Sequence, residues 1–416
     1  MHIVYLSPTG QLGGAETSLR EMLAGLRVAC PEWKLSLVLG HAGPLAGIAR
    51  ALGVEVILLP FPARLARLSE SNRAISASLW NLFSVAFGLV GYRRRLKTVL
   101  ESLRPDVVHS NGLKMHLLGA WACPSGASLI WHIHDYVGAR KLTRHLLPRF
   151  QKACRLAIVN SNSVGSDLRT LAPALRMITI YNAIDLDRFC PAGPILDLDS
   201  LAGLAPAPAG TIRVGLVATF ATWKGHRVFL QALERVSPDT PVRAYIIGGP
   251  IYQAETSQAS LSELQEEVRR AGLSGKVGFT GFLTDTASAM RSLDVIVHAS
   301  TQPEPFGMVI IEGMATGKAV IASQGGGARE LFVDGENGLG HAPGDPVGLA
   351  RQIERLCRDA ALRKALGESG RRTAERSFPR QRMAAELLSA YGSVRGAEHG
   401  IANRTAIHSP AQAVGE

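Results

Sequence analysis

Short apolar runs, each bounded by polar or glycine-rich positions, recur along the first half of the chain. They predict strands over residues 2–7, 35–39, 54–59, 107–110, 129–134, 156–160 and 177–181. Most of the segments between them are long enough for a helix, and apolar strands that alternate with helices are typical of a parallel sheet covered on both faces. We therefore predict a doubly wound α/β domain over residues 1–190.

A second domain of the same class is predicted after a break in this pattern. Residues 191–210 are rich in Pro, Ala and Gly without sustained periodicity, which indicates a linker. A strand over residues 212–218 opens the second domain, residues 211–378, and buried strands are also predicted over 293–300 and 318–323. Two domains also fit the length of 416 residues, which is too long for one typical core.

The C-terminal end of the chain divides into a helix and a tail. Phe378-Pro379 precedes a stretch with helical periodicity, which predicts a helix over residues 379–393. Residues 394–416 are small and polar, and we expect them to be disordered.

The composition is that of a globular protein from a reducing compartment. The chain is 46% hydrophobic and 19% charged, so it can bury a sizeable core. Its opening residues predict a strand and lack the cationic start and long apolar stretch of a signal peptide. The cysteine spacings indicate neither a disulfide framework nor a zinc site, and the number is odd. The five are Cys30, Cys123, Cys154, Cys190 and Cys357. We therefore expect a cytoplasmic protein.

The positive charge is concentrated in the first half. Residues 1–190 hold 22 of the 45 lysines and arginines but 11 of the 34 acidic residues, so the whole formal excess of +11 lies there. Within this half an apolar stretch from Trp80 runs into Arg93-Arg94-Arg95-Leu96-Lys97, and it is too short and interrupted to span a bilayer. Trp80 to Lys97 fits an interfacial helix on an anionic membrane, or a core helix with a solvated basic end. No nucleic-acid motif accompanies the charge, so we expect no nucleic-acid partner.

Two glutamates on either side of a turn are the strongest candidates for binding chemistry. Pro303 and Pro305 keep Glu304 off any helix, whereas Glu312 lies in the apolar helix predicted to begin near residues 306–308. The free N–H groups at such a helix start bind phosphates or hydroxyls. Two such acids are usually solvated or ion-paired on a surface. Here, however, they follow a predicted strand, and ligands of open α/β sheets bind beyond the carboxyl ends of strands.

This stretch resembles the donor-site signature of retaining, GT-B-fold glycosyltransferases of family 4, in which two glutamates are separated by seven residues around an E-P-F-G core. Other segments that resemble the family are Gly13-Gly14-Ala15-Glu16, His132-Ile133-His134-Asp135, Asn160-Ser161-Asn162-Ser163, Tyr181-Asn182-Ala183-Ile184-Asp185, Lys224-Gly225, Ile247-Gly248-Gly249 and Val277-Gly278-Phe279-Thr280-Gly281. The resemblance covers about residues 1–390. It implies two Rossmann-like doubly wound parallel-sheet domains facing across a cleft, with the C-terminal helix crossing back to the first domain.

The resemblance also implies an activity: transfer of a sugar from a nucleotide diphosphate sugar to an acceptor hydroxyl, with retention of configuration. The implied catalytic residues are Glu304, His134 and Lys224. The implied nucleotide-sugar site consists of Gly14, Thr219, Lys224, Phe282, Leu283, Glu304, Phe306, Gly307, Met308, Val309 and Glu312. Neither a metal ion nor a cofactor is implied. Without the resemblance, a lone histidine at a strand end, such as His134, would be structural about half the time.

Each implied role follows from the chemistry of the side chain. Lys224 and the N–H groups of Gly14 and residues 306–309 would stabilise the leaving diphosphate. Glu312 would bind the ribose hydroxyls, Glu304 the hydroxyls of the transferred sugar, and Phe282 with Leu283 would lie near the base. His134 would bond to the sugar or the acceptor from the first domain. The acceptor proton would pass to a phosphate oxygen.

One position departs from the family pattern. An arginine that commonly precedes the lysine, as a second phosphate ligand, is missing, since no basic residue lies between Thr219 and Lys224. Loss of such a charge-assisted bond costs on the order of 1.5 to 3 kcal/mol if nothing replaces it. Arg329 near the glycine loop, or the cations of the first domain, are the candidate replacements.

Three functions remain compatible with the sequence. The favoured one is a glycosyltransferase of bacterial polysaccharide or glycolipid synthesis, peripheral on the inner face of the plasma membrane, with a sugar or lipid-linked sugar as acceptor. The second is a nucleotide-sugar epimerase or a synthase with a soluble acceptor on the same fold. The third is a non-catalytic binding protein, which the missing arginine permits but Lys224, Glu304 and Glu312 argue against.

Overall fold

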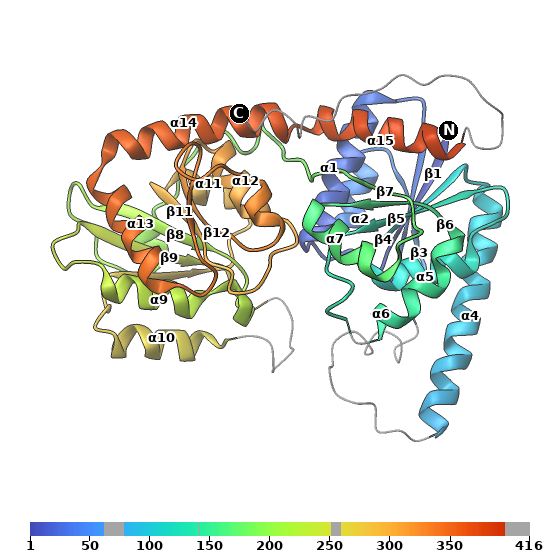
Figure 1. Ribbon diagram of the computed structural model, residues 1–416, viewed down its shortest axis with the longest axis horizontal. Coiled ribbons are helices and arrows are strands. Elements are labelled where there is room, and N and C mark those ends of the chain that lie inside the picture. The colour runs from blue at the N-terminus through green and yellow to red at the C-terminus, as the bar shows by residue number, and fades with distance from the viewer. Residues whose placement is uncertain (62–78, 141, 251–258, 396–416) are drawn as a thin grey trace.

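The computed structural model describes residues 1–61, 79–140, 142–250 and 259–395, with the side chains of residues 79–87 outside this description. Two α/β domains lie next to each other, and the last helix crosses from the second to the first (Figure 1). The predicted fold class, two Rossmann-like domains of the GT-B type, is therefore confirmed.

The first domain is built on a seven-stranded sheet of order β3-β2-β1-β4-β5-β6-β7, and every neighbouring pair is parallel. Its strands are β1 (His2–Ser7), β2 (Lys34–Leu39), β3 (Glu55–Leu58), β4 (Val107–Asn111), β5 (Ser128–Ile133), β6 (Cys154–Val159) and β7 (Met177–Thr179). The helices are α1 (Gly14–Ala29), α2 (Pro44–Ala51), α4 (Leu79–Leu103), α5 (Leu113–Ala122), α6 (Thr143–Leu146), the 3-10 helix η1 (Leu147–Ala153) and α7 (Asn162–Leu171). All seven predicted strands are confirmed within two residues at either end.

The second domain carries a six-stranded parallel sheet of order β10-β9-β8-β11-β12-β13. Its strands are β8 (Ile212–Val217), β9 (Val242–Ile247), β10 (Val277–Gly281), β11 (Val295–His298), β12 (Ala319–Ser323) and β13 (Leu339–His341). Its helices are α9 (His226–Arg235), α10 (Leu261–Arg270), α11 (Thr286–Arg291), α12 (Met308–Ala315), α13 (Pro346–Arg358), α14 (Ala360–Ser377) and the 3-10 helices η2 (Thr222–Lys224) and η3 (Gly327–Glu330).

Both sheets reverse their strand order at one point, between β1 and β4 in the first domain and between β8 and β11 in the second. The strands on either side of such a point send their following helices to opposite faces, which opens a crevice beyond their carboxyl ends. The loops that follow β1, β4, β8 and β11 are therefore where a ligand is expected.

The C-terminal helix α15 (Arg380–Arg395) lies against α1 of the first domain (Figure 1). Met383, Leu387 and Tyr391 are buried in the core of that domain. Arg380 forms ion pairs with Glu21 and with Asp185, the latter at 2.8 Å. The predicted crossover helix is thus confirmed. The predicted tail needs a correction at its start, because residues 394 and 395 belong to α15, and residues 396–416 lie outside the described part of the chain.

The predicted linker over residues 191–210 is more ordered than its composition indicates. It contains the short helix α8 (Leu198–Leu201), from which Asp199 reaches the second sheet. The buried carboxylate of Asp199 accepts bonds from the Tyr245 hydroxyl at 2.6 Å, from Arg243 at 2.7 Å and from Arg213 at 3.2 Å. This part of the segment is therefore fixed to β8 and β9 rather than free between the domains.

Candidate functional site

Glu304 lies at the centre of a buried polar cluster just beyond the end of β11. Its carboxylate oxygens accept bonds from Lys224 Nζ at 2.8 and 3.1 Å and from Ser300 Oγ at 2.8 Å. His298 Nε2 lies 3.3 Å from the same carboxylate, which is only 7% exposed. The protein itself therefore already satisfies most of the bonding capacity of Glu304. Its predicted contact with the transferred sugar stays a prediction.

The electrostatics of this cluster keep Glu304 ionised. Burial alone would raise the pKa of the Glu304 carboxyl, but the Lys224 ammonium and the His298 ring outweigh burial and lower the pKa to about 2. The ionised carboxylate of Glu304 therefore fixes the position of the Lys224 ammonium, at 2.8 Å.

Lys224 is placed by a backbone turn that only glycine permits. Gly225 follows it with φ of 79°, and a Cβ on Gly225 would lie 1.8 Å from the carbonyl oxygen of Ala299. The close approach brings η2 next to the loop after β11, so Lys224 meets Glu304 although 80 residues separate them. The Lys-Gly pair noted in the sequence is explained by this contact.

The predicted helix start near residues 306–308 is confirmed. Helix α12 begins at Met308 with Gly307 as its N-cap, at φ of 107°, and no side chain caps it. The first N–H groups of α12 therefore have no side-chain acceptor and remain available for an anion. Phe306 contributes its backbone only, because its ring is buried against Tyr181 and Phe378.

Glu312, one turn into α12, differs from Glu304 in charge state. Burial raises the pKa of the Glu312 carboxyl to about 7, although Arg188 and Arg20 oppose this shift. Among the described residues its carboxylate has no hydrogen-bond or ion-pair partner. A half-buried carboxylate without a protein donor is suited to accept bonds from ligand hydroxyls.

The ends of β9 and β10 form the other edge of the predicted donor site. Phe282 follows β10 and is 62% exposed, and its ring lies beside Gly249, which follows β9. An exposed aromatic ring offers a stacking surface for a planar base. Leu283 comes next in the same loop, and Thr219 is half-buried after β8. The structure thus brings the predicted base, ribose and phosphate residues of the second domain to one end of its sheet.

The first domain contributes a helix end that is already occupied by an acid. Gly14 is the first residue of α1, but the Glu16 carboxylate turns back to the backbone N–H groups of Gly13 and of Glu16 itself. Burial raises the pKa of Glu16. Any diphosphate at Gly14 would share this helix end with a carboxyl group, which the sequence pattern did not indicate. The phosphate contact of Gly14 stays a prediction.

The two domains touch each other beside Glu304. Tyr136 donates its hydroxyl hydrogen to the Glu304 carbonyl at 3.2 Å. Glu330 accepts from the backbone N–H groups of Asn162 at 2.8 Å and Ser163 at 2.7 Å, so a carboxylate of the second domain caps α7 of the first. Tyr181 donates to the same carboxylate at 2.9 Å. The first domain therefore reaches the candidate donor site directly.

Arg329, a candidate replacement for the missing phosphate arginine, keeps that role only as a prediction. Its side chain is exposed, and within the described chain it makes no contact with Lys224 or Glu304. The guanidinium groups that act on Glu312 are those of Arg188 and Arg20. Arg188 also donates to the Thr284 carbonyl at 3.2 Å, in the loop that carries Phe282. Neither arginine was singled out from the sequence.

Two family models match the chain. The model described as "Glycosyl transferases group 1" matches residues 206–373, and that described as "Glycosyltransferase Family 4" matches residues 41–188. The chain belongs to the group 1, family 4 glycosyltransferases. Each domain of this glycosyltransferase-family protein is thus matched by its own family model.

Two of the similar proteins are glycosyltransferases of lipopolysaccharide core biosynthesis. The lipopolysaccharide core biosynthesis glycosyltransferase LpsE of Rhizobium meliloti is 30% identical over 196 residues, 47% of this chain and 54% of LpsE. The lipopolysaccharide core biosynthesis mannosyltransferase LpcC of Rhizobium leguminosarum is 30% identical over 217 residues, 52% of this chain and 60% of LpcC. The chain therefore spans little more than half the length of the curated relatives it matches.

Solved structures share the fold over nearly the whole chain. The crystal structure of Anabaena HepE in complex with UDP-glucose has a TM-score of 0.77 at 24% identity, and the match covers 94% of this chain and 100% of HepE. Sucrose-phosphate synthase of Thermosynechococcus elongatus has a TM-score of 0.74 at 20% identity, with 95% and 100% covered.

The burial pattern of α4 partly answers whether Trp80 to Lys97 forms a membrane-surface helix or a core helix. Tyr92, Leu96 and Leu100 are buried in the first domain, whereas the side chains of residues 93–95 and Lys97 are exposed. The C-terminal part of α4 is thus a core helix with a solvated basic face, while its N-terminal part extends away from the sheet (Figure 1). The side chain of Trp80, at the start of the predicted membrane contact, falls outside the described side chains. No helix in the described ranges is long and apolar enough to cross a bilayer.

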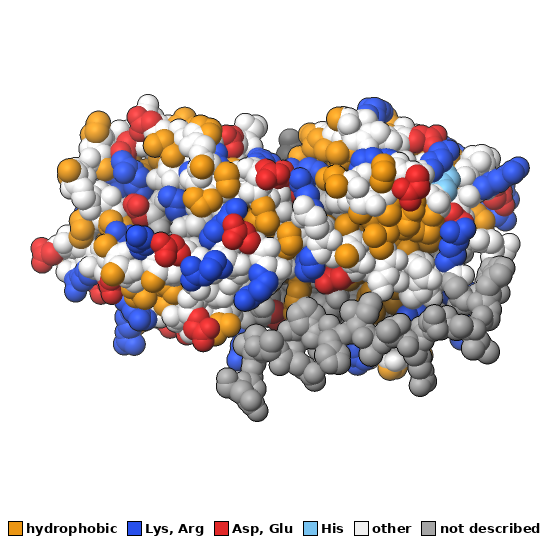
Figure 2. All heavy atoms as spheres, turned by 90° about the horizontal axis from the view of Figure 1, so that it is seen from above, with side chains coloured by type: hydrophobic (Ala, Val, Ile, Leu, Met, Phe, Trp, Pro, Cys, Tyr) orange, Lys and Arg blue, Asp and Glu red, His pale blue; other side chains and the backbone are white. Residues whose placement is uncertain are grey.

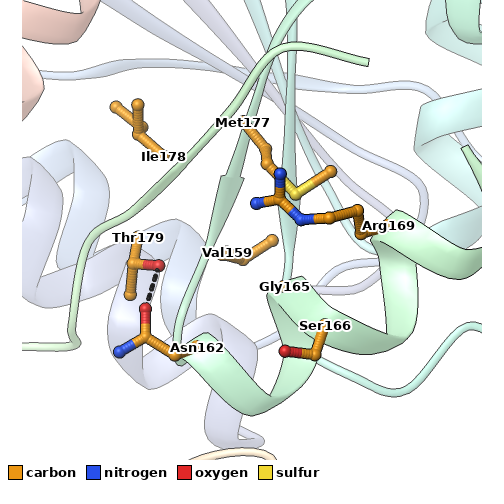
Figure 3. Close-up of a pocket in the computed structure, with 8 residues that line it drawn as sticks. All are labelled: Val159, Asn162, Gly165, Ser166, Arg169, Met177, Ile178 and Thr179. Carbon is orange, nitrogen blue, oxygen red and sulfur yellow. Dashed lines mark hydrogen bonds between the residues drawn. The ribbon is translucent and has the colours of Figure 1, made fainter. Parts of the chain in front are cut away.

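Acidic and basic side chains are interspersed over both domains on the face seen from above (Figure 2). A surface hollow of about 140 Å³ lies between α7 and β7 (Figure 3). Thr179 donates to Asn162 at 2.8 Å on one side of it, and Arg169 lies next to Met177 on the other. This hollow contains none of the predicted donor-site residues.

Proposed function

We propose that this protein transfers a sugar from a nucleotide diphosphate sugar to an acceptor hydroxyl with retention of configuration, in lipopolysaccharide or other polysaccharide synthesis. The observation that carries the proposal is the placement of Lys224, the uncapped start of α12 and Glu312 at one sheet end. Family membership supports it, as does the similarity to LpsE and LpcC, which are named as lipopolysaccharide core biosynthesis enzymes.

The proposed chemistry assigns each group to a charge that develops during transfer. As the bond between sugar and diphosphate breaks, negative charge grows on the leaving phosphate oxygens. Lys224, fixed by Glu304, stabilises this charge, and the N–H groups of α12 add to it. A phosphate oxygen then takes the acceptor proton, so the oxygen of the acceptor can attack the same face of the sugar. Glu304 remains ionised throughout and acts on the reaction through Lys224 and the sugar.

We propose that no divalent ion is needed, because Lys224 supplies the positive charge that a metal would otherwise provide. No group of three or more His, Cys, Asp or Glu side chains in the described ranges could hold a metal ion. A thermal-shift screen against UDP, GDP, ADP and their sugar conjugates, with and without a chelator, tests this. UDP-glucose is the first ligand to use, since HepE was crystallised with it. Stabilisation that a chelator abolishes would contradict the metal-free site, and no shift with any nucleotide would favour a non-catalytic protein.

The raised pKa of Glu312 predicts that donor binding depends on pH. Above about pH 7 the carboxylate accepts bonds from ribose hydroxyls, and below it the neutral carboxyl accepts more weakly. We expect affinity for the nucleotide sugar to rise about tenfold between pH 6 and pH 8. The folding stability of the unliganded protein changes with pH in the opposite direction. The folded state binds the Glu312 proton more tightly than the unfolded chain does, so the free energy of unfolding falls as pH rises from 4.5 toward about 7.

Isothermal titration calorimetry with wild type and Glu312→Gln checks the pH dependence. The nucleotide sugar is the ligand of choice because its diphosphate has no ionisation in this range. Glu312→Gln should bind weakly at both pH values without the rise. A rise that persists in Glu312→Gln would show that another group controls it.

We further propose that the acceptor is carried on a membrane lipid and that α4 meets the membrane. Arg93, Arg94 and Arg95 project from α4 into solvent, and each basic side chain near an anionic surface contributes about 1 kcal/mol. Reversing all three charges to glutamate should weaken binding to anionic vesicles by at least about a hundredfold.

Co-sedimentation with vesicles of phosphatidylglycerol measures this. The matched control, Arg235, Arg269 and Arg270→Glu, makes the same charge change on the second domain and should bind almost as wild type. Equal binding by both variants would remove the membrane proposal and favour a soluble acceptor.

A further inference from the structure

His134 makes one side-chain hydrogen bond in this structure, and its partner is fixed. Its Nε2 lies 2.6 Å from Oδ1 of Asn111, the last residue of β4. The amide of Asn111 is itself oriented, because its Nδ2 donates to the carbonyl oxygen of Ala15 at 3.4 Å, in the first turn of α1. Asn111 is fully buried, so its Oδ1 is directed at the histidine.

This contact determines where His134 carries its proton. An amide oxygen can only accept, so the hydrogen in the bond to Asn111 must belong to Nε2 of His134. Burial lowers the pKa of His134 to about 3, so the ring is neutral and holds a single N–H at physiological pH. Nδ1 must then carry a lone pair.

Nδ1 of His134 is buried and has no partner within the described residues. A buried acceptor that forms no hydrogen bond costs free energy of folding. The ring cannot turn freely to relieve this, because it packs closely against the ring of His132, with 4.0 Å between ring centres and 33° between the ring planes. His132 is held from behind by His109 at 3.2 Å, and His109 by the hydroxyl of Tyr391 on α15 at 2.9 Å.

We propose that Asn111 is a positioning residue that holds His134 in the Nε2–H tautomer, so that Nδ1 accepts a hydrogen bond from a substrate hydroxyl. The identity of the substrate in this inference rests on the proposed function, whereas the tautomer of His134 follows from the structure alone. In the opposite tautomer Nδ1 of His134 would carry the hydrogen and act as a donor. It would then bind a carbonyl or phosphate oxygen of the substrate and could not accept a hydroxyl hydrogen.

Several titratable groups surround His134 and bear on any pH effect. His132 and His109 face it from β5 and β4, Tyr391 lies behind them on α15, and Asp135 is its neighbour in the chain. Burial lowers the pKa of both histidines, so they are neutral at physiological pH. Glu16 lies beside Ala15 at the start of α1.

Histidine-selective ¹⁵N NMR of the full-length protein tests the tautomer, with the His134 signal identified by its loss in His134→Gln. The wild type should show a protonated Nε2 and a bare Nδ1. Asn111→Asp keeps an acceptor for Nε2–H but adds a negative charge, so the tautomer should persist while the pKa of His134 rises by about 1–3 units. Asn111→Ala removes the acceptor and should populate the Nδ1–H form.

Turnover adds a second readout. The acid limb of kcat/KM should move upward in Asn111→Asp by the same amount as the NMR titration, since a protonated Nδ1 cannot accept. Asn160→Ala is the matched control, because Asn160 is also buried but bonds only to the backbone carbonyl of His134, at 3.5 Å. It should leave the tautomer unchanged. Protonated Nδ1 in the wild type would overturn the proposal even if Asn111 variants fail to fold. An Nε2–H tautomer without any nucleotide-sugar binding would instead point to failure of the proposed function.

Discussion

Replacing Lys224 with alanine is expected to lower kcat/KM by at least about thirtyfold, which corresponds to about 2 kcal/mol of transition-state stabilisation. The ammonium group contacts both carboxylate oxygens of Glu304, at 3.1 and 2.8 Å. Its loss removes the one full positive charge that the structure fixes in this cluster. Steady-state rates with a nucleotide sugar donor measure the effect once the thermal-shift screen has identified the base.

The same substitution should also destabilise the second domain. Glu304 would remain buried without its partner, and breaking a buried ion pair from one side costs about 3–5 kcal/mol. The pH dependence of this stabilisation follows from the pKa of Glu304, which is lowered from 4.5 to about 2. Its stabilising contribution is present above pH 4.5 and is lost as pH falls toward 2. In Lys224→Ala the pKa of Glu304 should rise, because burial is no longer outweighed by the ammonium, so this acid-induced loss should become smaller, which acid unfolding curves can resolve.

Two comparisons separate catalysis from folding. Lys364→Ala removes an exposed lysine of α14 that pairs only with Glu368, and it should change neither rate nor stability measurably. Lys224→Ala combined with Glu304→Gln removes both charges, so much of the stability should return while turnover stays low. Intact turnover in Lys224→Ala would show that the donor site has been assigned to the wrong residues.

Replacing Asp199 with alanine is expected to cost the second domain about 3–5 kcal/mol of stability without a direct effect on the site. Asp199 accepts bonds from Tyr245, Arg243, Arg213 and the backbone N–H of Ala207. Burial would raise the pKa of its carboxyl, but these bonds outweigh burial and hold the pKa well below its usual range. Its contribution to stability is therefore present above pH 3.8 and is lost as the pH falls below that value.

Urea unfolding and hydrogen exchange measure this prediction together. In Asp199→Ala the amide protons of β8 and β9 should exchange faster, while those of the first sheet should stay protected, because the domains have separate cores. Asp197→Ala is the control on the same short helix. Asp197 is an exposed N-cap that accepts from Ser200, so its loss should cost only about 1 kcal/mol. Equal effects of the two substitutions would mean that the buried bonds of Asp199 contribute little.

The strands of both domains could be predicted closely because a parallel sheet is buried on both faces, so each strand is a continuous apolar run. The start of α12 was predictable for a local reason as well, since Pro303, Pro305 and Gly307 act on their own backbone. The order within the predicted linker was not predictable, for the opposite reason. Composition describes what residues 191–210 are made of, but Asp199 is fixed by residues of β8 and β9.

By itself the sequence determined the two-domain architecture, the order of the elements, the helix that crosses back and the spacing of Glu304 and Glu312. Only the tertiary structure decided which side chains meet. Lys224 reaches Glu304 because β8 and β11 are neighbours, and Asn111 reaches His134 because β4 pairs with β5 so that Asn111 lies opposite His132. Strand order within a sheet leaves little trace in local sequence, since it depends on packing between distant segments. The charge states of the two glutamates follow from the same packing, which gives Glu304 an ammonium partner and leaves Glu312 without one.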